Sequence, residues 1–383
     1  MTAEAAPTAV VADPDGARAA AGRSLEPAGA RRRRRAPDGA LVLRSPRLGA
    51  SVRVPVRPLV VTVAVAATAL LVFAWSLSVG DFPVAFGDVL ASLVGRGSAD
   101  SDFIVRTLRL PRGLAALTVG AALGISGAIF QRIARNPLAS PDIVGVTAGA
   151  TACAVLTIVV LDGTPSQVTW GALAGSTVTS VAIYLLSYRR GVTGYRLVLV
   201  GIGATAMLTS VTSFLMTRAE VYDAQRAMVW LTGSLNGRGW EQVRPLGWGL
   251  GVLVPIALVL GRDLRLLDLG DDAARGLGAR VEGVRSGLLL IGVALAALAV
   301  SCAGPIVFVA LVSPQIARRL VGGTGAALLS SAAAGAALLV ASDLVARRLF
   351  APTELPAGIV TAVLGAPFLL WLLARADRVG SAG

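Results

Sequence analysis

The chain has 383 residues, 55% of them hydrophobic, and a mean hydropathy of +0.73, which excludes an ordinary soluble domain with about 45–50% apolar residues. The formal charge is +13, and every basic residue is Arg because neither Lys nor His occurs. Without Lys there is no Walker A phosphate loop, and without His there is no Ser-His-Asp triad, imidazole metal site or histidine proton relay, so any ATP hydrolysis must take place on another chain.

Residues 1–56 are rich in Ala, Pro, Gly and Arg and include the Arg block 31–35. Because no apolar periodicity there could bury a core, we predict a disordered, Arg-rich cytoplasmic tail. A basic block before a first apolar span holds that end in the cytoplasm beside anionic membrane lipid. A nucleic-acid patch is the alternative, and we favour the topological interpretation with no nucleic-acid partner.

Apolar runs then predict a transmembrane domain over 57–378, since about 20 apolar residues in a helix cross the hydrocarbon layer. Gly304-Pro305 divides one run that is too long for a single span. With an even number of spans both termini are cytoplasmic, and the distribution of Arg favours this orientation. The ten predicted helices cover 58–79, 113–131, 143–161, 168–187, 196–216, 245–261, 286–303, 305–320, 326–346 and 357–374.

The predicted spans contain almost no Asp, Glu or Arg, and the clearest exception is Asp343 near the outer end of the ninth span. Ion-coupled carriers usually need ionisable groups at membrane depth. An ion-coupled secondary transporter is therefore the weaker alternative. An intramembrane enzyme has almost no residues from which to build a nucleophile–base pair or a metal site.

Small residues recur instead of charges. Gly120 and Gly124, and again Gly145 and Gly149, form patterns that let helices approach closely. We favour helix packing over a translocation path as the reason for these patterns.

A faint internal similarity links two of the spans. The run 119–128 after Arg112 is similar to the run 292–301 after Arg285. These runs belong to predicted spans two and seven, which cross in opposite directions, as in an inverted five-plus-five repeat.

The longest predicted cytoplasmic loop covers 262–285. Asp271 and Asp272 suggest the start of a short helix, because acidic side chains accept hydrogen bonds from free amides in a first turn. Gly276 and Gly278 suggest its end. A charged helix on the membrane surface suits the docking of a soluble partner, and a solvated loop is the alternative.

Several long motifs follow one another in a fixed order along the chain: Arg109-Leu-Pro-Arg112, 119–131, 135–145, 149–150, 269–278, 304–318 and 354–362. Together they resemble the FecCD family, the permeases of iron-siderophore and vitamin B12 importers. The resemblance covers about residues 58–375, and 140–145, 201–203 and 233–238 look closest to the second permease subunit of ferric-enterobactin-type systems.

The resemblance implies an all-α integral membrane protein with the ABC type II importer permease fold, about ten transmembrane helices in an inverted five-plus-five arrangement, in the plasma or inner membrane. Its partners would be a second FecCD-type permease, as a heterodimer or homodimer, two ATPase subunits that hold ATP and Mg, and an extracytoplasmic siderophore-binding protein. The chain itself would be no enzyme and would bind no cofactor or metal. Its cargo would be a ferric siderophore of the catecholate type, with vitamin B12 or haem as alternatives, moved by alternating access.

The resemblance also implies roles for particular residues. Arg109, Arg112 and Arg347 would dock the binding protein, since Arg forks onto carboxylates and stays charged; for Arg109 and Arg112, anchoring of the second span is the alternative. Thr193 and Gly194 match the neighbourhood of the cytoplasmic gate. The coupling to the ATPase would use Leu269, Gly270, Asp271, Asp272, Ala274, Arg275, Leu277 and Gly278.

Two departures from the family pattern stand out. Gln315 occupies a position where the family commonly has His, and Gly-Gly-Thr-Gly replaces an Asp-His-Arg that often follows. Whether Gln315 keeps the hydrogen bonds of that His is left open by the sequence.

Overall fold

The computed structural model describes residues 34–35, 41–45, 50–54, 56–188, 194–267, 270–278, 280–322 and 328–380. The chain divides into two units, Met1–Val56 and Arg57–Gly383. The division falls where the sequence predicts the boundary between the tail and the transmembrane domain.

The first unit contains a small antiparallel sheet in the order β1-β2-β3. In the register of β2 and β3, Leu41 lies opposite Val54 and Leu43 lies opposite Val52. Alternation of apolar and polar residues favours such strands, and the prediction of a tail without regular structure overlooked it. The rest of the predicted tail lies outside the described residues. The strands are β1 (Arg34–Arg35), β2 (Leu41–Ser45) and β3 (Ala50–Val54).

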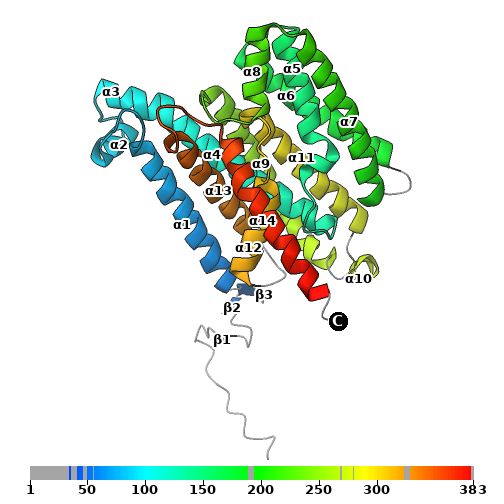
Figure 1. Cartoon of the computed structure of the whole chain (residues 1–383). Helices are drawn as coiled ribbons and strands as arrows, with labels where there is room; N and C mark the ends of the chain where they lie inside the picture. The colour runs from blue at the N-terminus through cyan, green and yellow to red at the C-terminus, as the bar shows by residue number, and fades with distance from the viewer. Residues whose placement is uncertain are drawn as a thin grey trace, which may run out of the picture. The chain divides into compact units, whose positions relative to one another are not determined.

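The second unit is a helical bundle in which each of the ten predicted helices is found (Figure 1). Within the described part of the chain, seven helical segments are long and apolar enough to cross a membrane, and Val146–Val159 and Ala357–Leu372 are shorter apolar helices. The ten helices are α1 (Val56–Ser78), α4 (Leu110–Ile133), α5 (Val146–Val159), α6 (Pro165–Ser187), α7 (Gly194–Arg218), α9 (Trp240–Leu267), α11 (Val281–Ala303), α12 (Val309–Val321), α13 (Leu328–Arg348) and α14 (Ala357–Gly380).

Short helices connect the long ones, and α10 alone among them is predicted from the sequence. They are too short to span a membrane, so a search for long apolar runs does not find them. Figure 1 shows α2, α3 and α8 toward one end of the bundle and α10 toward the other. They are α2 (Phe86–Leu93), α3 (Ala99–Asp102), η1 (Phe103–Arg109), η2 (Pro141–Val144), α8 (Val221–Leu231) and α10 (Asp271–Gly276).

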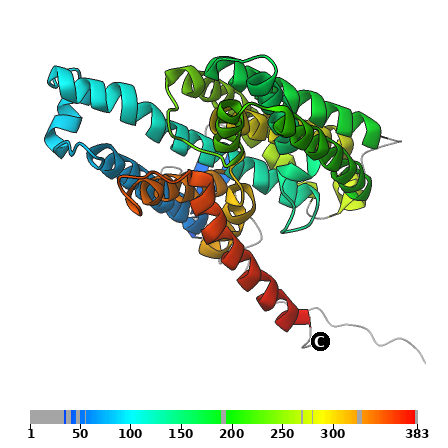
Figure 2. The same ribbon diagram turned by 45° about the horizontal axis from the view of Figure 1, so that its top comes forward.

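The centre of the bundle consists of α4, α11 and α13, most of whose apolar residues are buried. Helices α1, α7 and α9 are mostly exposed, with large apolar side chains such as Leu71, Trp75 and Ile202 on the surface. Water would disfavour so much exposed apolar surface, whereas hydrocarbon tails do not. Figure 2 shows α14 extending away from the other helices toward the C-terminus.

Close backbone contact between α4 and α13 depends on glycine. A Cβ atom on Gly120 would overlap the carbonyl of Gly335, and a Cβ atom on Gly124 would overlap the carbonyl of Ser331. Gly149 similarly lies against Gly175 of α6. The favoured interpretation of the two small-residue patterns as helix-packing motifs is therefore supported.

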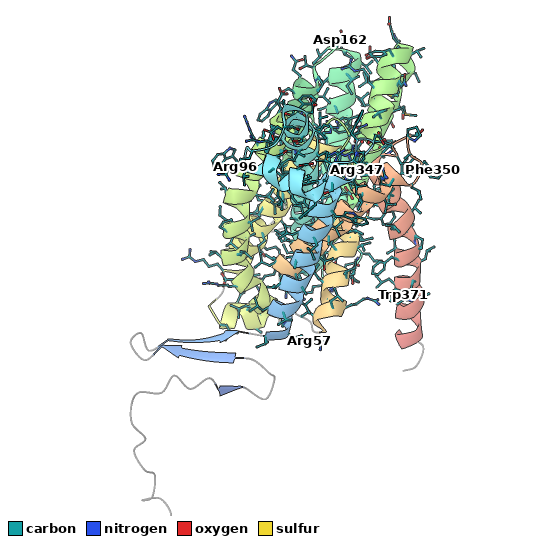
Figure 3. The ribbon with its side chains drawn as sticks, turned by 90° about the vertical axis from the view of Figure 1, so that its left-hand side faces the viewer. Arg57, Arg96, Asp162, Arg347, Phe350 and Trp371 are labelled. Carbon is teal, nitrogen blue, oxygen red and sulfur yellow. The ribbon has the colours of Figure 1, made fainter. Side chains whose placement is uncertain are left out.

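The two ends of the bundle differ in their side chains. Figure 3 shows Asp162, Arg347 and Phe350 toward one end and Arg57 and Trp371 toward the other. We call the first end the Arg347 end and the second the α10 end.

Candidate functional site

A buried carboxylate, Asp343, lies at the Arg347 end between two arginines. Arg112 donates from Nε and Nη2 to Asp343 Oδ1 over 3.1 and 3.0 Å. Arg347 Nε lies 3.2 Å from Asp343 Oδ2. The Asp343 side chain is only 3% exposed, so its charge is compensated by these two arginines rather than by solvent.

Arg112 also reaches a second acid. Its Nη1 donates to Glu354 Oε2 over 2.8 Å. Glu354 belongs to the connection between α13 and α14, so one guanidinium joins α4, α13 and that connection. Charge-assisted hydrogen bonds from one guanidinium to two carboxylates are strong and directional, so they hold these elements in a defined arrangement. The intramembrane acid noted in the sequence is therefore part of an internal ion-pair network.

Arg109, the residue before α4, contacts backbone instead. Its Nη1 donates to the Leu77 carbonyl over 2.8 Å, and its Nη2 donates to the Phe82 carbonyl. Arg109 thus links the end of α1 and the connection that follows it to the start of α4.

The three predicted docking arginines line one cavity of about 490 Å³ at the Arg347 end. Arg109, Arg112 and Arg347 are therefore brought together as the prediction requires. Arg112 and Arg347 are mostly buried and already form ion pairs within the chain, which gives them a structural role as well. Docking of a partner protein stays a prediction.

A second cavity, of about 380 Å³, lies beside α8. Arg226 of α8 contacts Asp162 and Asp223, each at 3.3 Å, and donates to the Gly163 carbonyl over 2.9 Å. Arg238, in the connection between α8 and α9, lines both this cavity and the larger one. Burial lowers the pKa of the Arg238 guanidinium. In the sequence, residues 233–238 contribute only to the resemblance, and no pattern there marks Arg238 as a residue that lines a cavity.

The predicted coupling loop forms a helix at the α10 end, and the prediction of a short helix there is confirmed. Ala274 is fully buried in the same cluster as Leu264 of α9 and Val281 of α11. Asp272 is fully exposed and pairs with Arg275 over 3.0 Å. One side of the helix is thus packed into the core through Ala274, and the other side exposes the charged side chains of Asp272 and Arg275.

The ends of this loop are set by glycine. Gly270 and Gly278 have φ values of +102° and +84°, which L side chains rarely adopt. Leu277, between the helix and Gly278, is 63% exposed. Leu269 and the side chain of Asp271 lie outside the described residues.

Gln315 of α12, one of the two departures noted in the sequence, is buried. Its Nε2 donates to Gln131 Oε1 over 2.9 Å and to the Pro137 carbonyl over 2.8 Å. Arg318 Nη2 donates to the same Gln131 oxygen over 3.0 Å. Glutamine therefore forms hydrogen bonds that join α12 to the end of α4 and the segment after it.

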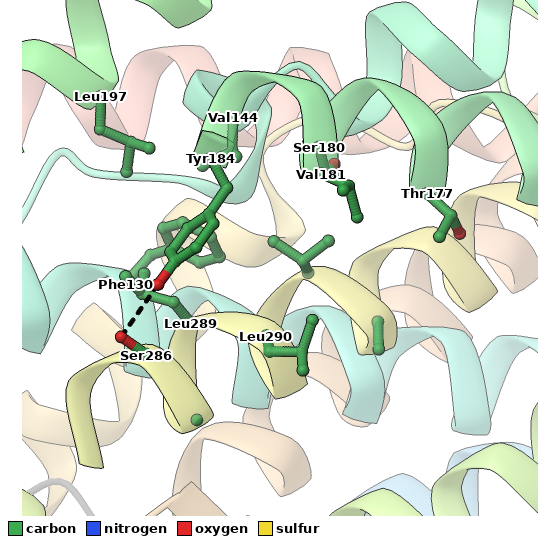
Figure 4. Close-up of a pocket in the computed structure, with 13 residues that line it drawn as sticks. Phe130, Val144, Thr177, Ser180, Val181, Tyr184, Leu197, Ser286, Leu289 and Leu290 are labelled. Atoms are coloured by element: carbon green, nitrogen blue, oxygen red, sulfur yellow. Dashed lines mark hydrogen bonds between the residues drawn. The ribbon is translucent and has the colours of Figure 1, made fainter. Parts of the chain in front are cut away.

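The predicted gate falls at the edge of the described chain. Thr193 lies outside the described residues, and Gly194 is the first residue of α7. Leu197, one turn into α7, lines an apolar cavity of about 290 Å³. Figure 4 shows this cavity, where Tyr184 Oη donates to Ser286 Oγ over 3.1 Å. No described residue that lines it is charged, so it offers nothing to pair with an ionic ligand.

Comparison with known proteins identifies the family. The model of the FecCD transport family matches residues 68–375. The chain is 41% identical over 304 residues to the ferric enterobactin transport system permease protein FepG of Escherichia coli (strain K12), covering 79% of this chain and 92% of that protein. It is 41% identical over 310 residues to the achromobactin transport system permease protein CbrC of Dickeya dadantii (strain 3937), covering 80% and 88%.

A solved structure extends this likeness to the fold. It is described as an inward-facing conformation of a metal-chelate type ABC transporter, and it matches with a TM-score of 0.74 and 27% identity over 82% of this chain and 99% of that chain. The predicted ABC importer permease fold is confirmed by this match.

Family membership also confirms that the chain is a transport subunit and not an enzyme, and it implies ATPase and substrate-binding partners. A secondary carrier would need neither partner. The chain belongs to the FecCD transport family and is a multi-pass permease subunit of an ABC importer.

Proposed function

We propose that this permease imports ferric siderophores, with an iron complex of the catecholate, enterobactin-like type as its cargo. The observation that carries the proposal is the 41% identity to the ferric enterobactin permease over 92% of that protein's length. Other relatives, from Bacillus subtilis (strain 168), are named for iron(3+)-hydroxamate and Fe(3+)-citrate import. An iron(III) chelate is therefore the cargo class that these relatives share.

The Arg347 end supports an anionic cargo. Its larger cavity is lined by Arg109, Arg112, Arg238, Arg347 and Arg348 and by only two carboxylates among the described residues, Asp81 and Glu354. A positively lined entrance raises the local concentration of an anionic ligand. A ferric tris-catecholate is such an anion.

In this proposal the Arg347 end faces outward and both termini are cytoplasmic. The extracytoplasmic binding protein delivers the chelate at the Arg347 end, with Arg109, Arg112 and Arg347 as predicted docking residues. A second FecCD-type permease completes the path, as a different subunit or a second copy. Two ATPase subunits, which hold ATP and Mg, bind at the α10 end and drive alternating access.

Uptake of radiolabelled iron tests the cargo. A strain that lacks this chain but keeps its partner subunits should import ferric enterobactin at background rate, and the wild-type chain should restore uptake at least about tenfold. Ferric hydroxamate, ferric citrate, vitamin B12 and haem serve as competing cargoes. Restored uptake of one of these, without restored enterobactin uptake, would reject the catecholate assignment.

Charged substitutions on α10 and at the residue after it test the coupling role. The exposed positions Asp272 and Leu277 can be changed to Arg without disturbing the core, because surface changes usually alter stability by less than about 0.5 kcal/mol. Truncating or reversing a central contact in an interface costs about 2 kcal/mol or more. We therefore expect D272R/L277R to weaken copurification of the ATPase by at least about tenfold and to abolish uptake.

The matched control is Glu220→Arg, a charge reversal at another exposed acid just before α8. Figure 1 shows α8 and α10 toward opposite ends of the bundle. The control should retain the ATPase fully. Equal retention of the ATPase by both variants would rule out α10 as its docking element.

A further inference from the structure

The cavity beside α8 has a lining that suits an aromatic anion. Among the described residues that line it are two arginines and two aromatic side chains but no carboxylate. Its polar lining consists of side chains that can donate hydrogen bonds: Tyr222, Gln225, Arg226, Trp230, Ser234, Asn236 and Arg238.

Arg238 differs from the other arginine in this cavity. Arg226 pairs with Asp162 and Asp223. The contact that the described part of the chain gives Arg238 is neutral, a bond from its Nε to the Ser234 carbonyl over 3.2 Å. An unpaired, largely buried cation is costly unless an opposite charge offsets it, and burial lowers its pKa accordingly.

A second group in this cavity also lacks a partner. Trp230 is 5% exposed, and its indole N–H has no hydrogen-bond acceptor among the described residues. Buried N–H donors nearly always have an acceptor from protein, water or ligand. Among the described residues, Arg238 therefore lacks an anionic partner and the Trp230 indole lacks an acceptor, and both residues line the same cavity.

We propose that Arg238 and Trp230 form an anion-binding subsite that receives one catecholate arm of the ferric chelate during its entry. The inference rests on the proposed function. Catecholate oxygens accept charge-assisted bonds from the guanidinium and the indole N–H. The catechol ring stacks against Tyr222 or Trp230. A ferric tris-hydroxamate is neutral and lacks an aromatic ring, so it would gain much less here.

The position of Arg238 between two cavities gives the subsite a route of access. Arg238 also lines the larger cavity, together with Arg109, Arg112 and Arg347. An anion that enters the larger cavity therefore comes next to Arg238, which also lines the smaller one. In the larger cavity the arginines attract the cargo through their charge alone. At the subsite, Arg238 and Trp230 donate hydrogen bonds to it.

Transport kinetics of the complete importer test this subsite. Both permeases, the ATPase and the binding protein are reconstituted in zwitterionic lipid, with radiolabelled ferric enterobactin as the probe. Arg238→Gln should raise KM for the chelate at least about tenfold, the range of a lost charge-assisted hydrogen bond. Trp230→Phe keeps the ring and loses the N–H, so it should raise KM by about threefold. Arg238→Lys keeps the charge and should restore most of the affinity.

Two further measurements separate binding from structure. Thermal unfolding of Arg238→Gln should match or exceed that of the wild type, because the change removes an unpaired buried charge. The control Arg244→Gln, at an exposed arginine in the first turns of α9, should leave KM unchanged.

An unchanged KM in Arg238→Gln, or a loss of uptake that follows a loss of folded protein, would overturn the subsite. A defect that occurs only in anionic lipid would assign Arg238 to a lipid headgroup and would also overturn it. Absence of enterobactin uptake by the wild-type importer would reject the proposed function and this inference together. Normal uptake with an unchanged KM in the variant would reject the inference alone.

Discussion

Asp343→Asn is expected to destabilise the permease by about 3–5 kcal/mol, since breaking a buried ion pair leaves uncompensated charges in a medium of low dielectric constant. In the variant, Arg347 loses its carboxylate and Arg112 keeps only Glu354. Thermal or denaturant unfolding of the purified protein in detergent measures the change. Loss of folded protein on size-exclusion chromatography would accompany it.

Glu354→Gln provides the comparison for Asp343→Asn. It removes a charge from the same network, but at a side chain that is 30% exposed. Partly exposed pairs contribute about 1 kcal/mol or less. If the two variants unfold at the same temperature, burial does not make the contribution of Asp343 to the free energy of unfolding larger than that of Glu354.

Gly120→Ala is expected to destabilise the bundle by about 1–3 kcal/mol, although alanine favours helices. The added methyl group would overlap the Gly335 carbonyl of α13, and backbone cannot rotate away as a side chain can. Separation of α4 from α13 would also loosen the elements that Arg112 joins. The unfolding midpoint in detergent measures the effect.

Gly247→Ala is the matched control for Gly120→Ala. Gly247 lies within α9, and a Cβ atom there meets no other atom within 4 Å. The same substitution should stabilise the protein by about 0.5–1 kcal/mol through helix propensity. Equal effects of the two alanine substitutions on the unfolding midpoint would contradict the destabilising overlap expected between α4 and α13.

The sequence was sufficient to locate the long helices and the short helix α10. Each long helix is encoded locally, by an apolar run bounded by Gly, Pro or Arg. Helix α10 was recognisable from Asp271 and Asp272 at its start and glycine at its end. Helix α8 was missed because its 11 residues are too few for a span and its sequence is mixed in polarity.

The side-chain network at the Arg347 end could not be read from the sequence. Arg112, Asp343 and Glu354 come from separate elements, and their contact depends on the rotation and tilt of α4 and α13. Hydropathy predicts that a helix crosses the bilayer, but it does not predict which residues of neighbouring helices each side chain contacts. The sequence marks Asp343 as an unusual intramembrane acid, but it does not identify the arginines that pair with it.

The burial of Ala274 gives α10 a mechanical property. Its base is enclosed by residues of α9 and α11, and close-packed interiors have low compressibility. If α10 docks the ATPase as proposed, we expect a force on its exposed side to be passed on to α9 and α11, because Ala274 is packed against the same core as these helices.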